Sequence, residues 1–170
     1  MSFDTKCVPD ELIPYMGLLG STLSLMDTKN YTYPELTNEI NINCGGLATG
    51  TALYSDKVDF SKNTIVYEVK SKALYEKVPF VLGMMEEIMY NTRFDDYKRL
   101  KEIIARIKSR LEASLMGQGH SIAMLECCAQ FSESAYYSDI LRGYKYYEFI
   151  KKLDEEFCLL YTSPSPRDRG

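Results

Sequence analysis

The sequence has few of the residues and motifs that catalytic and metal sites require. Its 170 residues include one histidine, His120, and no tryptophan, and they contain no phosphate loop, dinucleotide-binding glycine motif, nucleophile elbow or Cys-x-x-Cys pair. A single imidazole has no second one with which to share a metal ion, so we expect a structural role for His120. The alternative is a catalytic pair in which this histidine activates one of four thiols: Cys7, Cys44, Cys127 or Cys128.

Long apolar runs and an excess of basic charge are also missing. No run approaches the roughly 20 apolar residues of a membrane-spanning helix, and the opening MSFDTKCVPDE carries acids where a signal peptide is apolar. The 20 basic and 24 acidic residues are intermixed, for a net charge of −4, and form no stripe that would neutralise phosphates. We therefore expect neither a membrane nor nucleic acid as a partner.

The cysteines do not form a disulfide or zinc pattern. There are five of them, an odd number, and two are adjacent, Cys127 and Cys128, within a stretch of helical periodicity. This usage favours reduced, buried thiols.

The sequence does contain the apolar residues that one domain needs for its core. It is 45% hydrophobic, with 14 tyrosines and 7 phenylalanines, and its length suits a single domain. Thr32 and Glu35 are spaced to cap a helix reciprocally, and Gly117 with Gly119 should break a long one. Helical spacing of apolar residues predicts helices over residues 10–27, 32–43, 79–92, 95–116, 120–131 and 143–153.

Two segments alternate with the period of a strand instead. Residues 47–54 and 64–70, joined by a polar loop, predict an antiparallel hairpin, and hence an α+β domain in which an antiparallel sheet packs against helices. One face of the first strand carries small residues, Ala48, Gly50 and Ala52, beside Tyr54, so we expect something to pack closely there. A sheet of two strands alone is only marginally stable in water, so we expect further strands to complete it.

Charged and aromatic clusters have two interpretations each. Acidic pairs such as Glu86 with Glu87 and Asp95 with Asp96 are typical of solvated faces and helix starts. The aromatic residues near the C-terminus suit core and interface packing, and a peptide-binding surface is the alternative. These residues are Tyr136, Tyr137, Tyr144, Tyr146, Tyr147 and Phe149.

A longer set of segments resembles a known family. These are IPYMGLLGSTLSLMDTKNYTYPELTNEININCGGLATGTALY (13–54), VKSKALYEKVP, FDDYKRLKEIIARIKSRLEASLMGQGHSIA and SDILRGYKYYEFIKKL, in this order over residues 10–153. They resemble the third domain of presequence-protease-like peptidases, members of the pitrilysin and insulysin superfamily of zinc metallopeptidases. The resemblance implies four homologous α+β domains, of the metallohydrolase ferredoxin-like type, that enclose a chamber for unstructured peptides.

The same resemblance implies that this copy holds no metal. The catalytic domain of the family carries H-x-x-E-H on a helix, two zinc ligands with a general base. At the matching positions Tyr15 and Leu19 replace the two histidines, and Leu18 stands near the base. The distal glutamate ligand would fall near Arg106, a cation. We therefore expect no catalytic, cofactor-binding or metal residue in this chain, with zinc confined to the parent enzyme.

The implied function is that of a non-catalytic, chamber-forming domain of a zinc metalloendopeptidase. Its partners would be the other domains of the same polypeptide and unstructured peptides in the closed chamber. The alternatives are a metal-free structural or core subunit and a peptide-binding module of the same superfold. The bacterial cytoplasm is the expected location, and an organelle the alternative.

The resemblance also predicts where the domain is cut. Ser2 to Asp4 would be the end of a strand that precedes the first helix, and further strands would follow Leu153, so the domain would be truncated at both ends. We expect residues 1–157 to be a partial domain whose helix ends at Phe157. Residues 158–170, CLLYTSPSPRDRG, are similar to the translation of a sequencing adapter from metagenomic assembly, and we expect them not to be native protein.

Overall fold

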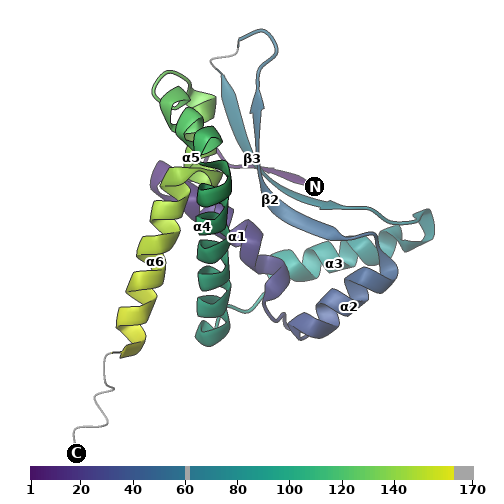
Figure 1. Cartoon of the computed structure of the whole chain (residues 1–170). Coiled ribbons are helices and arrows are strands. Elements are labelled where there is room, and N and C mark those ends of the chain that lie inside the picture. Colours follow the sequence, from purple (N-terminus) through teal and green to yellow (C-terminus); the bar gives the residue numbers. More distant parts are fainter. Residues whose placement is uncertain (60–61, 163–170) are drawn as a thin grey trace, which may run out of the picture.

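A three-stranded antiparallel sheet and two groups of helices make up the chain (Figure 1). The computed structural model describes residues 1–59 and 62–162, with side chains described up to residue 157. Helices α2 and α3 lie on one side of α1, and α4, α5 and α6 lie on the other. The expected class, α+β, is confirmed.

The sheet contains the two strands of the expected hairpin and the strand that was expected at Ser2 to Asp4. Strands β2 (Leu47–Ser55) and β3 (Asn63–Ser71) form the hairpin, and β1 (Ser2–Asp4) pairs with the other side of β3, in the order β1-β3-β2. All pairs are antiparallel, and Tyr67 of β3 lies between Phe3 and Thr51. Strand β2 is therefore an edge: within the described residues, no strand pairs with its outer side.

The two faces of the sheet are unlike. Tyr67 and Val69 are buried in a core that includes residues of α2 and α3. On the opposite face of β2, Ala48 is exposed, and a Cβ added to Gly50 would meet no atom within 4 Å. The expectation that something packs closely on the small-residue face is thus wrong for the part of the chain that the structure describes.

Helix α1 is shorter than its apolar pattern predicts. It spans Ile13–Thr22, and single 3-10 turns, Asp10–Leu12 and Leu23–Leu25, extend it at either end to cover most of the expected residues. The hydroxyls of Ser21 and Thr22 donate to the carbonyls of Gly17 and Leu18, at 3.2 and 3.1 Å. Such hydroxyls compete with regular helical bonding, which favours the change of helix type there.

Helix α2 begins as its sequence predicts. It spans Tyr33–Asn43, with Pro34 in its first turn. The carboxylate of Glu35 accepts the backbone N–H of Thr32 at 2.9 Å, and its pKa is lowered by this bond. The reciprocal cap orients the chain as it enters the helix.

Helix α3 (Val78–Tyr90) holds the loop before α2 through one buried carboxylate. Glu87, 7% exposed, accepts the backbone N–H of Asn30 at 3.0 Å and the side-chain amides of Asn30 and Asn91 at 2.8 and 2.7 Å. Burial alone would raise its pKa, but hydrogen bonds from Thr28, Asn91 and Asn30 outweigh burial and lower the pKa below 4.5. The ionised form is therefore the one that stabilises the fold.

Replacing this carboxylate should destabilise the chain in a pH-dependent way. Glu87→Gln is expected to cost about 1–3 kcal/mol at neutral pH, because an amide NH2 would then face the amide donors of the two asparagines. Since the folded pKa is depressed, the wild-type advantage is complete above the ordinary pKa of 4.5 and shrinks as pH falls below it. Urea unfolding at pH 7 and pH 3.5 measures both effects.

Glu86→Gln is the matched control for this experiment. Glu86 is the neighbouring, exposed glutamate of the same helix, so its neutralisation removes equal charge without touching the loop. Equal urea midpoints for the two variants at pH 7 would contradict the role assigned to Glu87.

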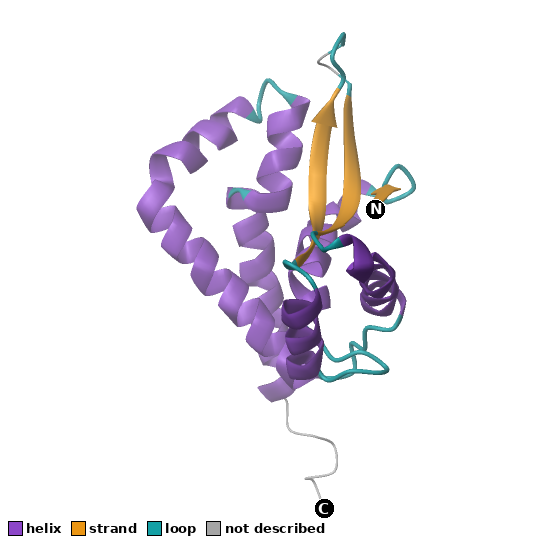
Figure 2. Ribbon diagram, turned by 90° about the vertical axis from the view of Figure 1, so that its right-hand side faces the viewer, coloured by secondary structure: helices purple, strands orange, loops and turns teal. Residues whose placement is uncertain are grey.

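The C-terminal half differs most from the sequence-based expectation. Helix α4 spans Tyr97–Cys128, and Asp96 caps it by accepting the N–H of Arg99 at 2.9 Å. The expected break between Gly117 and Gly119 is confirmed: Gln118, at φ −131° and ψ 29°, is not helical, and Figure 2 shows two helical arms that meet at an angle. The helix expected over residues 120–131 is the second arm of α4 and ends at Cys128.

Helix α5 (Glu133–Arg142) was not predicted, although Ser132 caps it and Gly143 ends it. Helix α6 begins at Tyr144 and runs to Thr162, so the expectation that its helix stops at Phe157 is wrong. Residues 163–170 lie outside the described residues, as do the side chains of residues 158–162. The non-native origin of residues 158–170 stays a prediction.

A second core joins α4 to α6 and to the end of α1. Its members are nearly inaccessible: Ile103 and Ile150 are 0% exposed, and Ile104 and Met26 are 1% exposed. Lys108 of α4 also pairs with Asp154 of α6 at 2.8 Å. Among the helices that the structure describes, none is long and apolar enough to cross a bilayer.

Candidate functional site

Helix α1 directs the three residues expected at the zinc-motif positions to three different places. Tyr15 is 45% exposed and stacks edge-on against Phe149 of α6, with ring centroids 4.7 Å apart. Leu18 is buried in the core between α4 and α6, and Leu19 packs against the core under the sheet. The structure therefore does not bring these side chains together around one point, and only the Tyr15 hydroxyl among them has a polar atom.

An apolar groove follows this side of α1. It encloses about 490 Å³ and includes side chains that are large and exposed, Leu12 at 48% and Phe94 at 42%. Its full lining is Val8, Leu12, Tyr15, Met16, Leu18, Leu19, Thr22, Phe94 and Leu100. Tyr15 is the one titratable side chain in this lining, and the groove suits packing against another apolar surface.

The opposite side of α1 lies against strand β2 and forms a second hollow, of about 450 Å³. Here α1 presents Gly17, Gly20 and Ser21, three residues that share one helix face. A Cβ on Gly20 would lie 2.7 Å from the Cα of Gly50, and the hydroxyl of Thr49 donates to the carbonyl of Gly20 at 2.8 Å. The two backbones approach so closely that only glycine fits. We call this hollow the β2 cleft.

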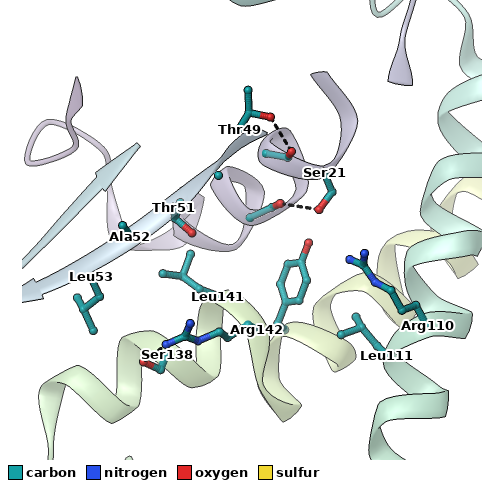
Figure 3. A pocket seen from close by; sticks show the side chains of 14 residues that line it. Ser21, Thr49, Thr51, Ala52, Leu53, Arg110, Leu111, Ser138, Leu141 and Arg142 are labelled. Carbon is teal, nitrogen blue, oxygen red and sulfur yellow. Dashed lines mark hydrogen bonds between the residues drawn. The ribbon is translucent and has the colours of Figure 1, made fainter. Parts of the chain in front are cut away.

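Helices α4, α5 and α6 close the β2 cleft opposite β2 with Arg110, Arg142 and Tyr146. Figure 3 shows both arginines across the cleft from Thr49 and Thr51. Arg142 donates weakly to the hydroxyl of Ser138, at 3.4 Å. The lining contains no acidic side chain, and no ion pair of either arginine is found among the described residues.

Tyr146 lines this cleft, and its hydroxyl is buried beside Ser21 and Arg110. The side chain is only 5% exposed. Burial raises the pKa of Tyr146 to about 12, and nearby Ser21 and Arg110 offset this only in part. The hydroxyl of Ser21 also donates to the carbonyl of Gly17. The phenol therefore stays protonated at neutral pH, and its hydrogen bond with Ser21 offsets part of the effect of burial.

The region near Arg106 continues the same basic wall. Arg106 and Arg110 line a neighbouring hollow of about 380 Å³ together with Ser24 and Ala48. Arg106, which was expected near the position of the family's distal glutamate ligand, thus lies beside a second cation, Arg110. This surface suits an anion better than a divalent metal ion.

The described chain contains no cluster of metal-binding side chains, and its thiols are free. Within it, no three His, Cys, Asp or Glu side chains come close enough to hold an ion. His120 is an exposed residue inside α4 and caps no helix. The cysteines within the described residues are free, as expected, but Cys7, Cys127 and Cys128 are exposed, so the expectation that the thiols are buried is wrong.

Sequence reasoning missed most of the β2 cleft. Tyr146 was included in the aromatic series, whose two interpretations were packing and a peptide-binding surface, but nothing in the sequence singled it out. Arg110 and Arg142 lie more than thirty residues apart in sequence, on α4 and α5, and only the tertiary fold brings both to one strand. The one local signal was the small-residue spacing of Gly17, Gly20 and Ser21.

Comparisons with known proteins agree with the resemblance. A family model described as "Peptidase M16C associated" matches residues 1–153. The protein HypA of Clostridium perfringens is 33% identical over 154 residues, which are 91% of this chain and 16% of that protein. A mitochondrial presequence protease of Yarrowia lipolytica is 30% identical over 146 residues, 86% of this chain and 15% of that protein.

A plant relative is covered by this chain to a similar extent. Presequence protease 1 of Arabidopsis thaliana, named chloroplastic/mitochondrial, is 27% identical over 160 residues, 91% of this chain and 15% of its own length. The chain thus spans about one sixth or less of the length of these relatives.

Proposed function

The chain belongs to the peptidase M16C-associated family, and from this premise we propose that it is a non-catalytic, chamber-forming domain of a zinc-dependent metalloendopeptidase that degrades unstructured peptides. It would be the third of four domains, as the resemblance implies. The presequence proteases among its relatives supply the peptidase activity by name, and the sixfold greater length of those proteins leaves room for a catalytic domain elsewhere.

The single observation that carries the non-catalytic role is the chemistry of α1. Zinc needs three or more nitrogen, sulfur or carboxylate ligands around one point. Tyr15, Leu18 and Leu19 diverge and supply none of these, and the other face of the helix supplies Gly17, Gly20 and Ser21 beside arginine. The residues on α1 do not fit a zinc ion, so we assign this chain no step of hydrolysis.

The apolar groove supports packing against other domains of the same polypeptide. Leu12, Tyr15 and Phe94 are each more than 40% exposed along it, which is costly for a surface that faces water in the working protein. We propose neither nucleic acid nor a membrane as a partner, in keeping with the acidic charge balance. The bacterial cytoplasm is the proposed location, with an organelle as the alternative.

A metal-free structural subunit or peptide-binding module is the second candidate. The β2 cleft favours it, because an edge strand beside unpaired donors is a common place for peptides to bind. In both candidates this chain forms part of a surface that contacts peptides or other domains and carries out no catalysis. They differ in whether the rest of the polypeptide carries a working zinc motif.

The test is peptide cleavage by the complete polypeptide, reconstructed from the flanking genomic sequence. We expect hydrolysis of an unstructured peptide, loss of cleavage with a chelator and recovery with zinc, whereas this chain alone should cleave nothing. Tyr15→Phe in the complete polypeptide keeps the ring against Phe149 and removes the only polar atom at the three motif positions. Because that hydroxyl touches no metal, zinc content and kcat should both stay unchanged.

Two results would contradict the proposal in different ways. Chelator-sensitive cleavage by this chain alone, or loss of zinc in Tyr15→Phe, would show that the domain takes part in catalysis. A folded complete polypeptide that binds no zinc and cuts no peptide would favour the metal-free alternative.

A further inference from the structure

A hollow of about 340 Å³ lies between helix α3 and the loop that precedes α2, and it shares no lining residue with the β2 cleft. On α3 the lining consists of residues that share one helix face: Pro79, Phe80, Gly83, Met84 and Glu87. Asn30 and Tyr31 of the loop line the other side. Glu87 is buried, whereas Asn30 and Gly83 are exposed, so the hollow has a buried floor and a rim open to solvent. We call it the α3 pocket.

The floor of the α3 pocket carries a negative charge without a counterion. Burial raises the pKa of Glu87, but hydrogen bonds from Thr28, Asn91 and Asn30 lower it below 4.5, so the carboxylate is ionised at neutral pH. All of these donors are neutral groups. Among the described residues no lysine, arginine or histidine forms an ion pair with Glu87, which is also the only charged side chain in the lining. Buried charges are usually paired, so a bound cation would offset part of the cost of burying this one.

The walls of the pocket specify what that cation carries. Tyr31 and Phe80 line it and pack against the core under the sheet, and Met84, which is 3% exposed, adds apolar surface beside Glu87. Aromatic rings attract positive charge, and apolar walls accommodate a hydrocarbon stem. The volume lies at the lower end of the range for small-ligand pockets. A compact positive head on a short carbon chain fits these features better than a hydrated metal ion does.

We propose that the α3 pocket binds an alkylammonium group, with its nitrogen near Glu87 and its carbon chain beside Tyr31 and Phe80. A free amine and the side chain of a lysine have the same chemistry, and either could supply this group. The inference does not rest on the proposed function, because binding of an amine is measured without any cleavage.

The test is a ¹H–¹⁵N NMR titration of the full chain with n-butylamine, which is protonated at pH 7. We expect saturable shifts at the amides of residues 30–31 and 79–87, with a Kd of about a millimolar for so small a ligand. Butanol and butyrate have similar size without the positive charge, and they should bind at least about tenfold more weakly.

Gly83→Leu tests the site by filling it. A Cβ on Gly83 would meet no atom within 4 Å, so the new side chain should enter the pocket without displacing the backbone. Butylamine binding should be lost, while the urea midpoint stays unchanged or rises, since leucine favours helix over glycine. Gly83→Ala is the matched control, because it adds a single methyl group and should weaken binding far less.

Glu87→Gln tests the charge. It should weaken butylamine binding about tenfold or more and reduce the preference over butanol. Because this variant is also expected to be less stable, binding is measured where circular dichroism shows it folded. Glu86→Gln removes equal charge from an exposed position outside the pocket and should leave affinity unchanged. Phe80→Leu keeps an apolar wall without the ring and should weaken butylamine binding severalfold while changing butanol binding less.

The outcomes against the inference are definite. Equal binding of butylamine, butanol and butyrate would show an apolar pocket that ignores charge, and unchanged affinity in Gly83→Leu or in folded Glu87→Gln would remove the site. The complete polypeptide then distinguishes the sources. Butylamine binding there as well supports a free amine, whereas binding to this chain and not to the complete polypeptide supports a lysine of that polypeptide as the occupant.

Discussion

Gly20→Val is expected to lower the free energy of unfolding by about 3 kcal/mol or more, because overpacking against rigid atoms is among the most costly substitutions. A Cβ at this position would lie 2.7 Å from the Cα of Gly50 and 3.2 Å from the carbonyl oxygen of Thr49. Both are backbone atoms of β2 and cannot rotate away. Relief requires α1 to move from the sheet, which would also break the 2.8 Å bond from Thr49 to Gly20. Urea unfolding followed by circular dichroism measures the loss.

Gly83→Ala is the control for the glycine substitution. Gly83 lies inside α3, and a Cβ there would meet no atom within 4 Å. Alanine should therefore stabilise the chain by about 0.5–1 kcal/mol, because it lowers the backbone entropy of the unfolded state and favours helix. If Gly20→Val unfolded at the wild-type urea concentration, the close approach of α1 and β2 would be refuted.

Ile104→Ala is expected to cost about 2–5 kcal/mol, the usual range for an emptied core site. Ile104 is 1% exposed in the core that joins α4 to α6, where Ile150 is fully buried. Neighbours on two long helices cannot collapse readily into the space that the smaller side chain leaves, so a cavity should remain. The midpoint of urea unfolding reports the change.

Two further variants separate the cavity from other effects of this substitution. Met116→Ala truncates a side chain of the same helix that is 89% exposed, and it should stay within about 0.5 kcal/mol of wild type. Ile104→Leu keeps the volume and should cost less than about 1.5 kcal/mol. A cost for Ile104→Ala as small as that of Met116→Ala would show that α4 and α6 do not share this core.

The β2 cleft and the apolar groove give opposite sides of α1 different surfaces. The groove carries Leu12, Tyr15 and Phe94, whereas the cleft carries two arginines and the buried phenol of Tyr146.

Much of the local structure followed from the sequence because its signals are short-range. The reciprocal cap of Thr32 and Glu35, the hairpin of β2 and β3, and the start of α4 at Asp96 each depend on neighbouring residues alone. The predicted helix break at Gly117 is present for the same reason, since the backbone of the neighbouring Gln118 departs from helical geometry between two helical arms. Helix α5 was missed although Ser132 and Gly143 are ordinary helix boundaries.

The sequence by itself determined the class of the domain, its main elements and its resemblance to one family, since periodicity and motif order are properties of the chain. Only the tertiary structure decided which residues meet. It separated Tyr15, Leu18 and Leu19, exposed three cysteines expected to be buried, and left the small-residue face of β2 open. It also brought Arg110, Arg142 and Tyr146 to one strand edge. Burial and charge proximity depend on contacts between residues far apart in sequence, and the helix angles that create those contacts are set by packing of the whole chain.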